Sequence, residues 1–366
     1  MSATPSTVEA ELRARFRQWG RDGTFASLGD PATLADGCER LRRLAYEADT
    51  LGIFLSVIAT AGLALPILAH AESPLAEQVR SGDAVAAVAI TERGAGSDVL
   101  AMASTVTTGA DGSLRLDGGK WHVTNAPLAD AIVVFAVDAT TEDRFVTAVL
   151  VRPDDPGVRR GPALDLIGCH GSPTGELWFD DVRLPSERRL GRPTDGKALL
   201  DLAFLRERAL APWPLLGKME RVLGECLDHV ERREQFQKAL HEFQYVQEKI
   251  VSGFDRMLHA RHLAERAIAA IAAGRPEPAI ASLAKATAAD AALHVFQAGI
   301  EVHGSYGVQA DRRYGDFVQD ALCAQIAGGT RETHKKVVFG ALRLERVRAR
   351  KGRPSPLLRG ENGRDR

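Results

Sequence analysis

The chain has 366 residues, of which 45% are hydrophobic and 26% charged, so it can bury a large core spread over more than one structural unit. The formal net charge of −1 gives no electrostatic attraction for nucleic acid or an anionic membrane, and neither partner is expected. The four cysteines are widely spaced and form no Cys-x-x-Cys pair. This spacing argues against a metal site and a disulfide framework, and it fits a reducing cytoplasm.

Helical spacing of apolar residues predicts an N-terminal helical domain over residues 1–83. The most apolar stretch, residues 51–69, contains polar residues and lacks basic flanks, which favours a buried helix over a membrane span. Pro66 and Pro74 predict breaks in this region.

From residue 84 to residue 192 the apolar period changes to two, which predicts a β-barrel domain. Two short alternating runs flank Asp111-Gly112, and this dipeptide predicts a hairpin turn. The expected strands cover residues 85–90, 106–108, 114–116, 120–123, 131–137, 145–151 and 176–179.

Helical spacing returns over residues 193–348 and predicts a C-terminal helical bundle, so the fold class is α+β. Pro212 and Pro214 should interrupt the helix that covers residues 199–211. Residues 349–366 are charged and rich in Gly and Pro, and we expect a disordered tail there.

A Gly-rich segment, Thr91 to Asp98, follows the buried strand that ends at Ile90. Glycines let the backbone approach a ligand closely, and free N–H groups and hydroxyls can then bind an anion or a carbonyl oxygen. On its own, the pattern is more typical of a simple turn.

Several separated motifs in the same order resemble the acyl-CoA dehydrogenase family of flavoproteins. They are Thr91-Glu92-Arg93-Gly94-Ala95-Gly96-Ser97-Asp98, Lys120-Trp121-His122-Val123-Thr124-Asn125, Gly168 to Thr174 followed by Phe179 to Val182, Arg233 to Phe236 with Gln244, Gly304-Ser305-Tyr306-Gly307, and Gly329-Thr330. The resemblance implies a helical domain, a β-barrel and a four-helix C-terminal domain with FAD bound between them.

The resemblance also implies roles for single residues. The residues that match positions at the flavin ring are Ala89, Thr91 and Thr124. His122 stands where the family has a tryptophan that packs on the flavin. Packing is also the preferred role for His122, and tuning of the ring's charge stays open. Gly96, Ser97 and Thr330 match positions near the diphosphate. The residues matching the adenosine side are Arg233, Phe236, Gln244, Glu301, Gly304, Ser305 and Gly307, and since Arg233 and Gln244 match residues that reach the FAD of a neighbouring subunit, a homodimer or homotetramer is implied.

The catalytic base is the largest departure from the family pattern. Many members carry a glutamate directly before Gly-Thr, but this position is Gly328, which cannot accept a proton and leaves room for substrate. Some members place the glutamate earlier, on a helix of the C-terminal domain, and counting back from Phe236 puts Glu207 there. Alternatively, Glu207 is a solvated residue paired with Arg206 or Arg208.

The predicted function is an FAD-dependent dehydrogenase that oxidises a small, α-substituted or hydroxylated acyl thioester. Glu207 would remove the α-proton and flavin N5 would accept a hydride. The short N-terminal domain favours an acyl-carrier protein over CoA, and the chain looks similar to dehydrogenases of the methoxymalonyl extender-unit route in polyketide biosynthesis. The alternatives are a short or branched acyl-CoA dehydrogenase, a flavin monooxygenase, and a DNA-binding relative that the balanced charge disfavours. The electron acceptor, an electron-transfer flavoprotein or oxygen, stays open.

Overall fold

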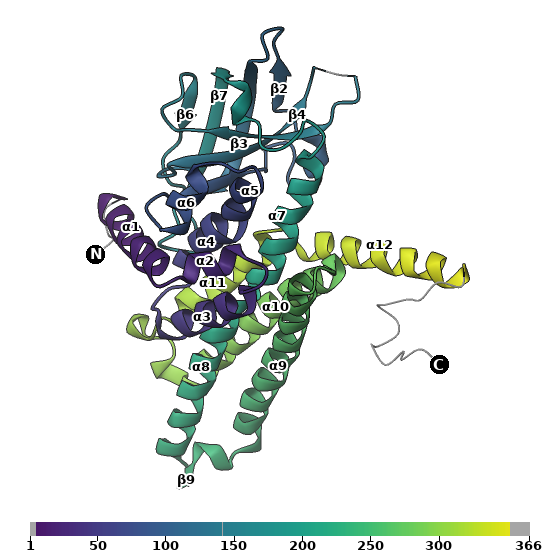
Figure 1. Cartoon of the computed structure of the whole chain (residues 1–366). Helices are drawn as coiled ribbons and strands as arrows, with labels where there is room; N and C mark the ends of the chain where they lie inside the picture. The colour runs from purple at the N-terminus through teal and green to yellow at the C-terminus, as the bar shows by residue number, and fades with distance from the viewer. Residues whose placement is uncertain (1–4, 141, 352–366) are drawn as a thin grey trace.

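The computed structural model describes residues 5–140 and 142–351. N-terminal helices, a central sheet and C-terminal helices follow one another along the chain, with the sheet at one end of the molecule and the long helices at the other (Figure 1). The predicted fold class is therefore confirmed. Residues 352–366, most of the predicted tail, lie outside the described residues.

The N-terminal part contains six α-helices and one π-helical segment. They are α1 (Pro5–Arg21), α2 (Thr24–Gly29), α3 (Leu34–Glu47), α4 (Gly52–Val57), η1 (Ile58–Ala64), α5 (Leu65–His70) and α6 (Leu75–Arg80). The predicted break at Pro66 is wrong, because the helical run continues through it and the π-helical turn of η1 absorbs the missing N–H donor. Among the described residues, Gly52–His70 is long and apolar enough to cross a membrane, but 83% of that window is buried in the protein, as in a core helix.

The central part is a mixed sheet of seven strands in the order β1-β4-β2-β3-β7-β6, with β5 paired to β4. The strands are β1 (Ala86–Ala89), β2 (Thr105–Thr108), β3 (Leu114–Thr124), β4 (Ala131–Asp138), β5 (Val146–Val151), β6 (Val158–Arg160) and β7 (Thr174–Leu184). β2 and β3 form the expected hairpin, whose turn uses Gly112 at a φ of 80°. The ladder of described strands ends at β5 and β6 and does not close into a ring, so the domain is an open mixed sheet.

The C-terminal part is built around a buried, alanine-rich helix, α10 (Pro278–His303), which contacts five other helices. Those helices are α7 (Gly196–Leu210), α8 (Pro212–Arg232), α9 (Gln244–Ala272), α11 (Tyr314–Ile326) and α12 (Arg331–Arg350). The predicted break between α7 and α8 falls at Pro212. A hairpin of two short strands, β8 (Glu234–Gln235) and β9 (Lys238–Ala239), lies between α8 and α9. The sequence analysis did not predict it.

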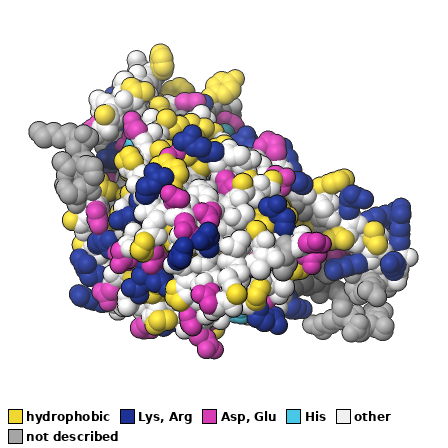
Figure 2. Space-filling model, turned by 90° about the horizontal axis from the view of Figure 1, so that it is seen from above, with side chains coloured by type: hydrophobic (Ala, Val, Ile, Leu, Met, Phe, Trp, Pro, Cys, Tyr) yellow, Lys and Arg dark blue, Asp and Glu magenta, His cyan; other side chains and the backbone are white. Residues whose placement is uncertain are grey.

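A single carboxylate links the three parts. The side chain of Asp320 on α11 accepts the backbone N–H of Leu51 at 3.1 Å and of Cys169 at 2.5 Å. These bonds connect the start of α4, the loop before β7 and the bundle, so elements that are far apart in the sequence are held in one arrangement. On the surface, basic and acidic side chains are mixed over the face seen in Figure 2.

Candidate active site

The Gly-rich segment after β1 is anchored by a buried ion pair. The Nζ atom of Lys120 on β3 donates to Glu92 Oε1 at 2.7 Å and to the carbonyl oxygen of Ile90 at 3.0 Å. Glu92 also accepts the backbone N–H groups of Ala103 and Ser104. These bonds and burial act in opposite directions on the carboxyl of Glu92, and the bonds prevail, so its pKa is lowered. The loop that follows is therefore held rigidly against β3.

The N–H groups of Gly94, Gly96 and Ser97 have no hydrogen-bond partner among the described residues. A Cβ atom placed on Gly94 or Gly96 would meet no atom within 4 Å, so the loop lies beside open space. Unpartnered N–H groups in a glycine loop form a concave site for an anion such as a diphosphate. This part of the predicted FAD site therefore fits the cofactor.

The flavin-ring residues predicted from the sequence lie together on β1 and β3. Ala89 is fully buried at the end of β1, and the carbonyl oxygen of Thr91 accepts the N–H of Trp121 at 2.8 Å. His122 is exposed on a bulge of β3, with a φ of 51°, and Thr124 is the last residue of that strand. Their roles toward the flavin stay predictions.

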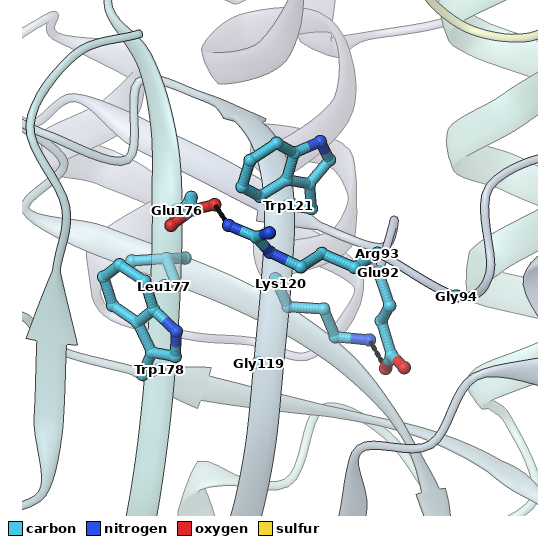
Figure 3. Close-up of a pocket in the computed structure, with 9 residues that line it drawn as sticks. All are labelled: Glu92, Arg93, Gly94, Gly119, Lys120, Trp121, Glu176, Leu177 and Trp178. Carbon is cyan, nitrogen blue, oxygen red and sulfur yellow. Dashed lines mark hydrogen bonds and ion pairs between the residues drawn. The ribbon is translucent and has the colours of Figure 1, made fainter.

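A cavity of about 220 Å³ lies between this loop and strands β3 and β7 (Figure 3). The guanidinium of Arg93 stands over the ring of Trp121, 3.9 Å from its centroid, and pairs with Glu176 at 2.5 Å. Trp178 lies on the far side of the cavity.

Glu207, the predicted base, extends from α7 toward the turn between α11 and α12. A Cβ atom on Gly328 would lie 2.4 Å from Glu207 Oε1 and 2.5 Å from its Cδ, so the carboxylate occupies the space where a side chain at position 328 would begin. The carboxylate of Glu207 therefore lies beside position 328, where many family members carry the catalytic glutamate. The alternative pairing of Glu207 with Arg206 or Arg208 is wrong, because Arg206 donates to the carbonyl oxygens of Gly62 and Leu28, and Arg208 contacts Gly328 and Ser282. Among the described residues, Glu207 forms no ion pair within 4.0 Å.

Burial raises the pKa of Glu207, and the positive charges of Lys285 and Arg208 act against this rise. A raised pKa makes a carboxylate a stronger proton acceptor. Neighbouring Arg206 points the other way and donates to the carbonyl oxygen of Gly62 at 2.8 Å. Successive residues of a helix face different directions, which separates the roles of these neighbours.

Three residues that the sequence analysis did not assign to the site, Arg208, Lys285 and His334, surround the Gly328-Gly329 turn. Lys285 on α10 donates to the carbonyl oxygen of Gly329 at 2.9 Å, and Arg208 approaches the carbonyl oxygen of Gly328 at 3.5 Å. His334 on α12 is 2% exposed, and neither ring nitrogen has a hydrogen-bond partner in the part of the chain that the structure describes. Thr330 caps α12 by accepting the N–H of Thr333. Since three helices contribute these groups, no short motif could have revealed the cluster.

The predicted adenosine-side residues lie at the far end of the bundle from the sheet, around the β8–β9 hairpin (Figure 1). A cavity of about 440 Å³ brings Arg233 next to Tyr306 of the 304–307 turn. Phe236 and Gln244 are exposed there, and Glu301 pairs with Lys249. Within the turn, Gly304 and Ser305 are exposed and Gly307 is buried. The roles of these residues toward a cofactor stay predictions.

Residues 194–342 match the family model of the acyl-CoA dehydrogenase C-terminal domain, and residues 87–182 match that of the middle domain. These matches cover more than half of the chain. The chain belongs to the acyl-CoA dehydrogenase family. It is therefore an FAD-dependent oxidoreductase, as the sequence motifs implied.

The chain is similar to members with different thioester carriers. It is 31% identical over 270 residues to the short-chain specific acyl-CoA dehydrogenase of Megasphaera elsdenii, covering 74% of this chain and 70% of that protein. It is 30% identical over 346 residues to the L-prolyl-peptidyl-carrier-protein dehydrogenase of Pseudomonas fluorescens, covering 90% of each. The crystal structure of the prolyl acyl carrier protein oxidase AnaB shares the fold, with a TM-score of 0.84, 23% identity and coverage of 90% of each chain.

Proposed function

We propose that this member of the family oxidises a small acyl thioester and that Glu207 removes the α-proton. The observation that carries the proposal is the position of the Glu207 carboxylate against Gly328. Among the described residues the carboxylate forms no ion pair within 4.0 Å, and Lys285 and Arg208 act on it only from a distance, so its oxygen atoms are available to accept a proton from the substrate. Glycine at position 328 is what leaves room for it.

FAD, when bound, accepts the hydride that leaves the acyl group. Thr91 and Thr124 would place hydroxyl groups at the flavin ring, and the N–H groups of Gly96 and Ser97 would hold the diphosphate. Thr330 would approach the same diphosphate at the start of α12, where the helix dipole favours negative charge. The work of the protein is then to position the two reactants and to hold the Glu207 carboxylate where it can accept the α-proton.

An acyl-carrier protein is the proposed carrier of the thioester. Support comes from the L-prolyl-peptidyl-carrier-protein dehydrogenase, whose 30% identity extends over 90% of both chains. An α-substituted or hydroxylated three-carbon acyl group of polyketide extender-unit biosynthesis fits this reading, and a short or branched acyl-CoA is the alternative.

A second copy of the chain is the proposed partner at the far end of the bundle. The guanidinium of Arg233 has no ion-pair partner among the described residues, and Phe236 and Tyr245 are 87% and 89% exposed. α12 projects from the body and exposes Phe339 and Leu344 (Figure 1). A dimer would cover these apolar groups and bring Arg233 to the partner's cofactor.

A panel of acyl-CoA and acyl-carrier-protein thioesters, mixed anaerobically with the FAD-loaded protein, tests the proposal. Bleaching of the oxidised flavin absorbance by a thioester is the expected result, and the fastest member names the carrier. If no thioester bleaches the flavin, while NADH, a flavin reductase and oxygen together support turnover, the protein is a monooxygenase and the proposal is wrong.

A further inference from the structure

The turn beside Glu207 is surrounded by more positive than negative charge. Arg208 and Lys285 are 8% and 3% exposed, so both cations are buried, and among the described residues Glu207 is the carboxylate that reaches the turn. Asp201, which also acts on Arg208, is already paired with Lys197 at 2.5 Å. Asp290, the other acidic group that influences Lys285, is already paired with Arg331 at 2.5 Å. A buried positive charge without a counter-ion is costly, so this arrangement favours a ligand that brings one negative charge.

The donors of the two cations are largely unused. Lys285 makes one hydrogen bond, to the carbonyl oxygen of Gly329, and Arg208 makes two long contacts, at 3.5 Å to Gly328 and 3.4 Å to Ser282. Neither cation lies within 4.0 Å of a carboxylate oxygen of Glu207, so no direct ion pair consumes their charge among the described residues. Such donors can bind a carboxylate through charge-assisted hydrogen bonds.

His334 is an independent pointer to a ligand at the same place. Its imidazole is 2% exposed, and among the described residues neither buried ring nitrogen makes a hydrogen bond. The ring lies beside the turn, because a Cβ atom on Gly329 would be 3.5 Å from its Cε1 and 3.6 Å from its Nε2. Burial, with Lys285 and Arg208, lowers the pKa of His334 to about 4, while the nearby backbone of Gly329 acts in the opposite direction. At neutral pH the ring is therefore uncharged and offers one N–H donor.

We propose that Arg208, Lys285 and His334 form a subsite for a carboxylate carried by the acyl group of the substrate. The inference rests on the proposed function, because the subsite lies beside Glu207 and therefore at the reacting end of the thioester. It narrows the substrate class to acyl groups with a negative charge near the α-carbon. It also separates this chain from a prolyl-accepting enzyme, whose substrate amine would be repelled by the same cations.

The test compares butyryl-pantetheine with succinyl-pantetheine, because the two acyl chains have equal length and differ in the terminal carboxylate. Pantetheine is common to CoA and carrier proteins, so the comparison does not depend on the carrier. The dissociation constant is measured from the shift in flavin absorbance, and the rate of bleaching is followed separately. L-prolyl-pantetheine serves as the cationic member of the set.

The informative variant is His334→Leu, because it removes two ring nitrogens that meet the criteria for no hydrogen bond among the described residues. It should weaken succinyl-pantetheine binding by about 10-fold and leave butyryl-pantetheine binding unchanged. Lys285→Met should weaken the same ligand by about 10- to 100-fold. His294→Leu on α10 is the control, since this half-buried histidine contacts Ser252 instead of the turn, and both ligands should bind it as they bind the wild type.

The charge on Lys285 adds a pH signature. Burial lowers the pKa of Lys285 to about 8, and the positive charge of Arg208 acts in the same direction. The negative charges of Glu207 and Asp290 act against this shift. His334, which also faces Lys285, is uncharged at this pH. The dissociation constant for succinyl-pantetheine should therefore rise as the pH passes through about 8, and that for butyryl-pantetheine should not.

Two results would overturn the subsite. One is equal binding changes for both ligands in His334→Leu and Lys285→Met. The other is loss of FAD from these variants with an unchanged ratio of the two ligands, which would mean that the cations serve the cofactor diphosphate. If neither thioester bleaches the wild-type flavin, the proposed dehydrogenase chemistry fails, while the binding ratio still decides the subsite.

Discussion

Replacing Gly328 by alanine should displace the catalytic carboxylate. The new Cβ atom would lie 2.4 Å from Glu207 Oε1, whereas ordinary contacts begin at 3.4 Å, so the carboxylate must move by about 1 Å. A misplacement of this size lowers the rate of a positioned reaction by about 100-fold. The substitution also forces alanine to a φ of 68°, which costs about 1 kcal/mol in stability.

The control for backbone strain is Gly274→Ala. Gly274 has a φ of 66°, and a Cβ atom there would meet nothing within 4 Å, so the strain is matched and no contact is made. Stopped-flow measurement of flavin bleaching by a saturating thioester should show a loss of about 100-fold for Gly328→Ala and none for Gly274→Ala. Equal rates in the two variants would refute the placement of Glu207 against position 328.

Three further variants test other parts of the account. Lys120→Met should lower the free energy of unfolding by about 3 kcal/mol in urea titrations, because it leaves the buried charge of Glu92 unpaired, and adding Glu92→Gln should recover part of this loss; no loss would contradict the anchoring role of the pair. The pKa of His334 is lowered from 6.5 to about 4, so the unfolded chain binds more protons between these values. Stability should therefore fall by about 3 kcal/mol as the pH drops from 6.5 to 4, and His334→Leu should abolish this contribution; an unchanged pH dependence would contradict it. Arg233→Ala should weaken FAD binding by about 10-fold in fluorescence titrations, whereas Arg232→Ala, whose guanidinium already contacts Asp228, should not; equal retention would exclude Arg233 from the cofactor site.

Local signals in the sequence predicted much of the fold. The Asp111-Gly112 dipeptide located the β2–β3 hairpin, and Pro212 located the break between α7 and α8, because each acts on the backbone within a few residues. Pro66 did not break its helix, because the π-helical turn directly before it removes the cost of the missing backbone N–H. The β8–β9 hairpin was missed because its turn uses Phe236 and Gln237 at positive φ, where no glycine or asparagine marks it.

The site was only partly predictable. Glu207 and Gly328 could be selected one at a time through the family resemblance, but their contact is a fact of three-dimensional packing. Lys285 and His334 belong to no sequence motif. They lie beside the Gly328-Gly329 turn because α10, which precedes the turn in the chain, and α12, which follows it, both pack against it. Charge balance within a cluster depends on which side chains meet, and a sequence does not report this.

Anaerobic bleaching of the flavin by the preferred thioester, compared between wild type and Glu207→Gln, tests the central claim most directly. The glutamine keeps the size of the side chain and removes its basicity. The account predicts that bleaching slows by at least about 100-fold while thioester binding persists. Bleaching at the wild-type rate would show that another group removes the α-proton and would contradict the account.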